Sequence, residues 1–282
     1  MVCRRRGVAK SQFRRSGTVA MSAQPRSCLI GYSGFVGSNL AARHSFTDLF
    51  RSSNIDEIRG RQYDLLICAG APAEKWKANQ QPEADGANID RLIRNVAEVR
   101  ASRVFLISTV DVYPVIRDAD ESYDCEGLPN HAYGTNRLRL EKAFREMFAG
   151  LHIVRLPGLF GPGLKKNVIY DLLHDNCLDA IHPESTFQYY DVTSLWEDLG
   201  IIEKNQLDLV NLVTEPLATR RMVDACFPQK QVGPGKGAVA HYDLRSSHAE
   251  LFGGHDGYRF DLNCVLSRLG AYIQSAGQGA AA

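Results

Sequence analysis

The 282-residue chain lacks the run of about 18 uninterrupted apolar residues that a membrane-spanning helix needs. It has no C-x-x-C pair, and its seven cysteines are scattered and odd in number. This pattern argues against a disulfide framework or a structural zinc site and favours a reducing, intracellular setting. The whole chain has 44% hydrophobic and 23% charged residues, a composition typical of a globular protein.

Acidic residues are absent from the first 26 positions, which carry seven Lys and Arg. Without this segment the chain has 26 basic and 32 acidic residues, and such an acidic body argues against nucleic-acid binding. We expect residues 1–26 to form a disordered basic extension; an organelle transit peptide and a basic arm for anionic partners are the alternatives. Because an apolar signal-peptide core is missing, we expect a cytoplasmic protein.

A glycine-rich turn, GYSGFVG at 31–37, follows the apolar run 28–30 and precedes the helix-forming stretch 38–43. A buried strand, a tight glycine turn and a helix form the entry of a dinucleotide-binding unit. The first glycine permits the turn, the second lets a pyrophosphate approach, and the third lets the helix pack close to the strand. N–H groups at the helix start then face the phosphates. The predicted cofactor contacts here are Gly31, Ser33, Gly34, Phe35, Val36 and Gly37.

Strand-like and helix-like segments alternate beyond this turn. Strands are expected at 46–50, 63–69, 103–108, 152–156, 187–192 and 209–213, and helices at 83–99, 132–148 and 218–226. The alternation predicts an α/β fold, a Rossmann-like doubly wound parallel sheet with helices on both faces. We expect residues 27–163 to bind NAD(P). Residues 164–282 are expected to form a smaller, mainly substrate-binding region, from which 209–213 returns to the main sheet.

Three motifs follow in order: STVDVY at 108–113, YGTNR at 133–137 and RLPGLFGPG at 155–163. With the glycine turn, their order and spacing resemble the extended short-chain dehydrogenase/reductase family of sugar-nucleotide epimerases, dehydratases and reductases. The resemblance runs from about residue 27 to about 215. It implies a nicotinamide cofactor, a sugar-nucleotide substrate and a homodimer formed through the helices at 83–99 and 132–148.

The resemblance implies that Tyr133 transfers a proton and that Thr109 orients the substrate oxygen. Where the family has Lys, this chain has Arg137. A phenol ionises near pH 10, and a cation one helical turn away stabilises its phenolate. Arg137 keeps the charge and can hold a ribose hydroxyl, but it cannot release a proton, so a relay through an amine is lost. Val110 and Asp111 replace the adjacent Asp and Glu of the dehydratases, which argues against dehydration.

The resemblance assigns further contacts. Those to the cofactor are Ala69, Gly70, Ser108, Pro157, Gly158 and Leu159, together with Tyr133 and Arg137. Those to the substrate are Thr109, Asp111, Lys165, Asn167 and Gln188. The His and Asp residues between 241 and 256 match no standard metal-binding spacing, so no metal is expected.

The residues after the second strand distinguish NAD from NADP. A carboxylate there would bind the ribose hydroxyls of NAD, whereas an arginine would suit the NADP phosphate. If the strand ends at Phe50, Arg51 and the following serines face the ribose; if it ends earlier, Asp48 does. The register is open, and we favour NADP because an arginine fork binds phosphate well.

We therefore predict an NAD(P)-dependent oxidoreductase or epimerase that acts on a sugar nucleotide or a related carbohydrate, with neither a nucleic-acid nor a membrane partner. The alternative is a non-catalytic NAD(P)-binding sensor or scaffold. Arg137 keeps that alternative open, and the Thr109–Tyr133 pair opposes it.

Overall fold

The computed structural model describes residues 25–279. Most of the predicted basic extension, residues 1–24, lies outside the described residues. Arg26, which we placed in that extension, contacts the folded domain instead. Its Nη2 donates to Asp48 Oδ2 at 2.8 Å, and its backbone N–H donates to Asp64 Oδ2 at 2.7 Å. Among the described residues, no helix combines the length and apolar character needed to cross a membrane.

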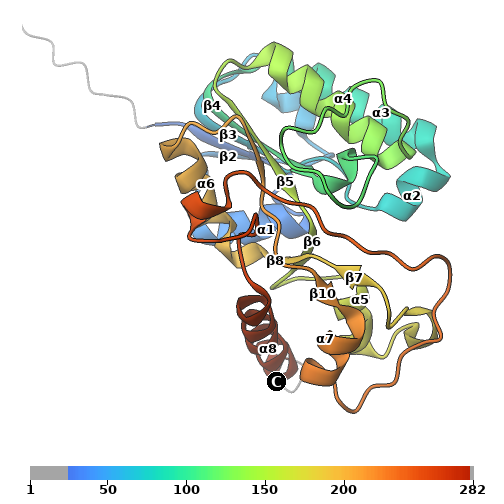
Figure 1. Cartoon of the computed structure of the whole chain (residues 1–282). Coiled ribbons are helices and arrows are strands. Elements are labelled where there is room, and N and C mark those ends of the chain that lie inside the picture. The colour runs from blue at the N-terminus through green and yellow to red at the C-terminus, as the bar shows by residue number, and fades with distance from the viewer. Residues whose placement is uncertain (1–24, 280–282) are drawn as a thin grey trace, which may run out of the picture.

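A six-stranded sheet with the order β2-β1-β3-β4-β5-β9 forms the centre of the protein (Figure 1). The strands are β1 (Ser27–Ile30), β2 (Asp48–Phe50), β3 (Gln62–Cys68), β4 (Arg100–Thr109), β5 (Leu151–Leu156) and β9 (Leu209–Asn211). All adjacent pairs are parallel, which confirms the predicted doubly wound sheet. The order reverses at β1, because β2 lies on one side of it and β3 on the other. In such sheets, ligands bind beyond the carboxyl ends of the strands at this switch point.

Helices cover both faces of the sheet (Figure 1). One face carries α2 (Lys75–Gln80), α3 (Pro82–Val96) and α4 (Ala132–Met147), and the other carries α1 (Phe35–Arg43) and α6 (Leu195–Lys204). Side chains of each strand alternate between two hydrophobic clusters: Ile30 packs in the cluster with Ile89, and Leu29 in the cluster with Leu40. The sequence predicted α1, α3 and α4, with ends that differ from the structure by at most three residues, but it did not predict α2 or α6.

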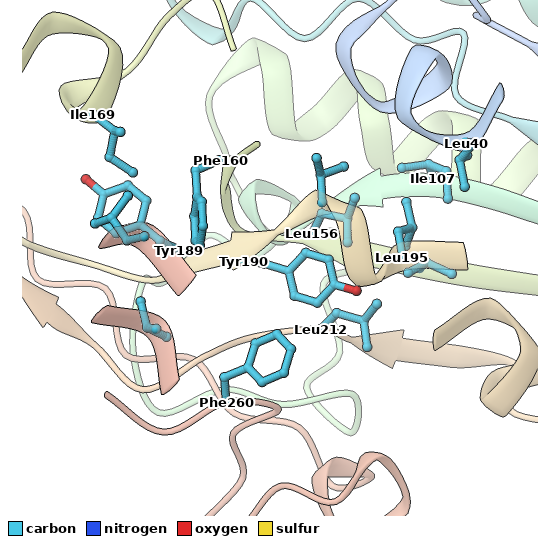
Figure 2. Packing of buried hydrophobic residues seen from close by; sticks show 14 of the residues in the cluster. Leu40, Ile107, Leu156, Phe160, Ile169, Tyr189, Tyr190, Leu195, Leu212 and Phe260 are labelled. Atoms are coloured by element: carbon cyan, nitrogen blue, oxygen red, sulfur yellow. The ribbon is translucent and has the colours of Figure 1, made fainter. Parts of the chain in front are cut away.

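The smaller C-terminal part consists of short strands and of helices that differ in length. They are β6 (Gly158–Phe160) paired with β8 (Tyr189–Asp191), β7 (Thr186–Phe187) paired with β10 (Leu217–Ala218), and the helices α5 (Val168–His174), α7 (Thr219–Cys226) and α8 (Leu262–Gly279). The single strand expected at 187–192 is two strands interrupted at Gln188, and β6, α5 and α8 were not predicted. Leu156, Tyr190 and Phe260 pack in one cluster, which joins this part to the sheet (Figure 2).

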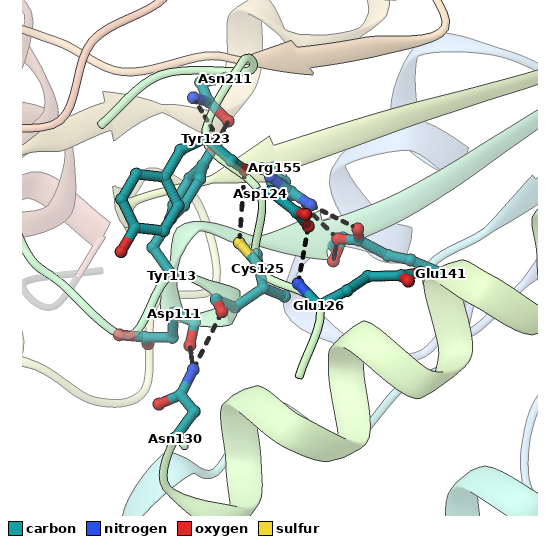
Figure 3. A network of polar contacts seen from close by, with 12 residues as sticks. Asp111, Tyr113, Tyr123, Asp124, Cys125, Glu126, Asn130, Glu141, Arg155 and Asn211 are labelled. Carbon is teal, nitrogen blue, oxygen red and sulfur yellow. Dashed lines mark hydrogen bonds and ion pairs between the residues drawn. The ribbon is translucent and has the colours of Figure 1, made fainter. Parts of the chain in front are cut away.

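A buried ion pair connects α4 to the centre of the sheet (Figure 3). Arg155 of β5 donates from Nη2 to Glu141 Oε2 at 2.7 Å and from Nε to Oε1 at 3.1 Å. Ser108 of β4 donates to Glu141 Oε1 at 2.5 Å. The two charged side chains are 4% and 1% exposed, so each depends on the other to compensate its loss of water.

Replacing Glu141 by Gln keeps the shape and leaves the Arg155 charge buried without its anion. We expect this change to lower the free energy of unfolding by about 3–5 kcal/mol. Glu203→Gln is the matched control, since Glu203 accepts from Arg103 at the surface and should cost less than about 1 kcal/mol. Urea unfolding of the three proteins measures both values. Equal losses for the two variants would contradict the structural role of the buried pair.

Candidate active site

Close backbone contacts require glycine in the turn after β1. Gly31 has a φ of +87°, and a Cβ at this position would lie 2.3 Å from the carbonyl oxygen of Ala69 and 2.9 Å from Cα of Gly70. A Cβ on Gly37 would lie 2.0 Å from the carbonyl oxygen of Gly31, so α1 starts directly against the turn. A Cβ on Gly34, by contrast, would meet Gly31 at 3.3 Å. The ends of β1 and β3 and the start of α1 therefore meet at one point.

The first turn of α1 faces outward from this point. Ser33 and Gly34 are exposed, and Phe35 and Val36 are half-buried. Gly34 is the N-cap of the helix and has no side chain that could accept the first N–H groups. These N–H groups have no acceptor within a helix, and the helix dipole favours an anion beside them. The turn therefore fits the pyrophosphate of a dinucleotide.

Arg51 is the first residue beyond the carboxyl end of β2, which ends at Phe50. Its backbone N–H donates to Asn54 Oδ1 at 2.8 Å, and its Nε donates to Ser53 Oγ at 2.9 Å. These contacts orient an exposed guanidinium on the side of the sheet where the glycine turn lies. The arrangement is the one expected if the second strand ends at Phe50.

Asp48 lies at the other end of β2, in register with Cys28. Its Oδ2 accepts from Tyr63 Oη at 2.8 Å and from Arg26 at 2.8 Å, and lies 3.3 Å from Nη1 of Arg61. Burial opposes ionisation, but the hydrogen bonds and the Arg61 charge lower the pKa of Asp48 overall. The alternative in which this carboxylate faces a ribose is therefore wrong, because Asp48 sits at the amino end of the strand.

Thr109 ends β4, and Tyr133 lies in the first turn of α4. Tyr133 is 7% exposed, and this burial raises the pKa of its phenol. The Arg137 charge and the hydrogen-bonding contact with Thr109 lower this pKa without cancelling the effect of burial. Thr109 Oγ1 also accepts the Asp111 N–H at 3.2 Å and thereby caps the short 3₁₀ turn 110–112. The predicted threonine and tyrosine thus lie together at the carboxyl edge of the sheet.

The Arg137 guanidinium stacks on the Tyr133 ring, with Cζ 4.4 Å from the ring centroid. Its Nη1 and Nη2 donate to the two oxygens of Asp85 at 3.2 and 3.1 Å, and Nη2 also donates to the carbonyl of Pro72. Asn136 donates to the same carboxylate at 2.8 Å. Both members of the pair are almost fully buried, at 3% and 5% exposure. We expected Arg137 to hold a ribose hydroxyl, but Asp85 of α3 and a backbone carbonyl occupy these donors instead.

A second polar cluster lies beside Thr109 and consists of Lys75, Asp111 and Tyr242. Lys75 Nζ donates to Asp111 Oδ1 at 2.7 Å and to Tyr242 Oη at 3.0 Å, and Tyr242 Oη donates to Asp111 Oδ1 at 3.0 Å. Tyr242 stacks on Phe187 at a centroid distance of 5.9 Å. We predicted a role for Asp111 alone. Lys75 lies on α2 and Tyr242 in the C-terminal segment, and no local spacing relates either to the motif 108–113.

Ser108 differs from its predicted role. Successive residues of a strand face opposite sides of the sheet, and the Ser108 hydroxyl donates to Glu141 of α4 rather than facing the cofactor side with Thr109. Pro157 and Gly158 follow β5 at the carboxyl edge, and Gly158 is exposed. Leu159 belongs to β6 and is half-buried. These three residues lie next to the carboxyl end of β5, in agreement with the position that the resemblance implies.

Two of the three predicted substrate contacts beyond residue 163 hold the fold together. Asn167 caps α5 and donates from Nδ2 to the carbonyl of Leu159 at 2.8 Å. Gln188 is 2% exposed, and its amide bonds two backbone carbonyls and the N–H of Leu244. Both amides are therefore engaged with backbone, whereas Lys165 is exposed. Within residues 25–279, no group of three His, Cys, Asp or Glu side chains is placed to hold a metal ion.

No protein-family model and no curated protein sequence matches the chain. Solved structures do match it. The chain is similar to the dTDP-4-dehydrorhamnose reductase of Bacillus anthracis in complex with NADP, with a TM-score of 0.70 and 14% identity over 90% of this chain and 100% of that one. It is also similar to the UDP-glucose 4-epimerase of Thermotoga maritima with UDP-glucose, with a TM-score of 0.68 and 14% identity over 90% of this chain and 99% of that one.

A third similar structure is an NAD-dependent NDP-hexosamine 5,6-dehydratase involved in tunicamycin biosynthesis, with a TM-score of 0.68 and 14% identity over 89% of this chain and 98% of that one. A reductase, an epimerase and a dehydratase thus share one architecture, and at these identities the likeness concerns the fold. The chain has the fold of the extended short-chain dehydrogenases/reductases.

Proposed function

We propose that this protein is an NAD(P)-dependent oxidoreductase or epimerase that acts on a sugar nucleotide. The observation that carries the proposal is the position of Thr109 and Tyr133 at the carboxyl edge of the sheet, on which the glycine turn also opens. The similar reductase was solved with NADP and the similar epimerase with UDP-glucose, which supports the same classes of cofactor and substrate here.

The cofactor would lie across the glycine turn 31–37. The first N–H groups of α1 would bind its pyrophosphate, and Arg51 would contact the phosphate that distinguishes NADP from NAD. Ala69 and Gly70 would flank its adenosine side, since they touch Gly31. The bound nicotinamide supplies or accepts a hydride.

Tyr133 would give or take the proton. Because burial raises its pKa, the phenol is protonated at neutral pH and is suited to donate a proton to a substrate carbonyl oxygen. Thr109 would hold that oxygen in line through its hydroxyl. This supports reduction of a keto sugar over oxidation of an alcohol. Val110, beside Thr109, has no proton to give, so dehydration is not part of the proposal.

The second candidate is a non-catalytic NAD(P)-binding sensor or scaffold. The pairing of Arg137 with Asp85 favours it, because the cation at this position is neutralised and cannot release a proton. For either function we also propose a homodimer through α3 and α4. These helices lie side by side on one face of the sheet (Figure 1).

Calorimetric titration with NADPH and NADH tests the cofactor assignment. We expect NADPH to bind at least about tenfold more tightly, a difference of about 1.4 kcal/mol. Arg51→Ala should remove that preference by weakening NADPH binding and leaving NADH binding unchanged. Arg59→Ala is the control, because Arg59 is an exposed arginine paired with Glu98. Binding of neither nucleotide to the wild-type protein would refute the role of the glycine turn.

Tyr133→Phe tests the proton-transfer role. We expect kcat for NADPH oxidation with dTDP-4-dehydrorhamnose or UDP-4-keto sugars to fall by about 100-fold or more, with NADPH affinity unchanged. The wild-type rate should stay flat from about pH 6 to about pH 9 and decline only as the phenol ionises. Tyr272→Phe on α8 serves as the control. Tight NADPH binding without turnover of any of these compounds would favour the sensor.

A further inference from the structure

A phenol that has given up its proton must recover it before the next turnover. Tyr133 is 7% exposed, so direct return from bulk water is hindered. Arg137 stacks on its ring but cannot supply the proton, because a guanidinium does not deprotonate in proteins. Its charge is also matched by Asp85 at 3.1 Å. The group that restores Tyr133 must therefore lie elsewhere around the phenol.

The helix that carries Lys75, α2, contacts the start of α4 through Asn79. Lys75 and Asn79 are four residues apart and lie on the same face of α2. Asn79 Oδ1 accepts the backbone N–H of Tyr133 at 3.0 Å, which fixes this face of α2 beside the phenol-bearing residue. Lys75 Nζ, one turn earlier, bonds Asp111 at 2.7 Å.

Asp111 is packed equally closely against the same turn of α4. A Cβ on Gly134 would lie 2.3 Å from the Asp111 carbonyl oxygen, so only glycine permits this approach. Asn130 donates to the carbonyls of Asp111 and Val112 at 3.1 and 2.9 Å (Figure 3). The Asp111 charge accordingly influences the Tyr133 phenol. Asp111 therefore lies near the Tyr133 phenol, and Lys75 bonds Asp111 from a separate element, α2.

The other titratable groups around Asp111 are less suited to deliver a proton. His131 accepts the Gly134 N–H on Nδ1 at 3.0 Å, and burial together with the Lys75 charge lowers its pKa, so the ring is neutral at pH 7. Tyr242 has a single hydroxyl proton, which it donates to Asp111. Lys75 carries three exchangeable protons, and its side chain is 38% exposed, so water can replace a proton that it loses.

We propose that Lys75 returns the proton to Tyr133 after each reduction, with Asp111 and Tyr242 positioning its ammonium group. This inference rests on the proposed reductase function. When the phenol has donated its proton to the substrate oxygen, one N–H bond of Lys75 breaks and the O–H bond of Tyr133 forms again. The phenolate and ammonium become a neutral phenol and a neutral amine. The amine then takes a proton from solvent, which restores the starting state.

Three variants distinguish proton delivery by Lys75 from an effect of its charge and from a structural role of its side chain. Lys75→Ala removes both the charge and the proton, and Lys75→Arg keeps the charge without a proton that can leave. Lys77→Ala is the matched control, because Lys77 is exposed on the same short helix and its nearest anion is Glu74 at 3.7 Å. Each full-length protein is assayed for NADPH oxidation with dTDP-4-dehydrorhamnose and UDP-4-keto-glucose, with and without added methylamine. NADPH binding is measured in parallel.

We expect kcat to fall by about 100-fold in both Lys75→Ala and Lys75→Arg, with NADPH binding unchanged and Lys77→Ala like wild type. Methylamine should restore Lys75→Ala in proportion to its concentration. Wild-type kcat in Lys75→Arg would overturn the inference by showing that charge alone suffices. A low kcat of Lys75→Ala that methylamine does not restore would also overturn the inference, because it would indicate a structural role for Lys75. A wild-type protein that binds NADPH and reduces neither compound would refute the proposed function, and the relay with it.

Discussion

An arginine that is almost fully buried needs an anion and acceptors for its donors, and Arg137 finds them in Asp85 and the carbonyl of Pro72. This requirement fixes α3 against α4, because Asp85 belongs to α3 and both Arg137 and Asn136 belong to α4. It also sets the orientation of Tyr133, whose ring lies against the guanidinium. The ion pair that holds α3 against α4 therefore also positions the candidate catalytic phenol of Tyr133.

Much of the fold could be predicted, because its signals are local. Each central strand of the sheet is buried on both faces and appears in the sequence as a short apolar run, and the turn at Gly31 admits only glycine. β2 was harder to place, since three residues carry too little pattern to fix a register. The strand expected at 187–192 is broken because Gln188 turns inward to bond backbone from two other segments. α8 was missed because a Gly- and Ala-rich tail obscures its end.

The candidate site was predictable only where a motif carries it. Thr109 and Tyr133 belong to recognisable motifs, whereas Lys75 and Asp85 are ordinary helix residues until tertiary packing brings Lys75 to Asp111 and Asp85 to Arg137 of α4. Asn167 and Gln188, which we predicted as substrate contacts, have side-chain amides that bond backbone. A polar side chain beside a motif can bond a ligand or its own backbone, and sequence does not specify the direction in which it points. Arg137 is a similar case, because the sequence predicts a ribose contact and the structure pairs its guanidinium with the Asp85 carboxylate.

The C-terminal segment around Tyr242 has a further consequence. The Tyr242 N–H donates to Thr186 of β7 at 2.9 Å, while the neighbouring Asp243 donates to Ile116 at 2.7 Å and accepts from Asp118 at 3.1 Å. Consecutive residues of one extended segment thus bind the two halves of the molecule in turn. Deleting or inserting one residue here would shift the register, so that Tyr242 would face the side that Asp243 now faces. The Tyr242 hydroxyl would then point away from Lys75. The length of this segment is therefore constrained more tightly than its composition.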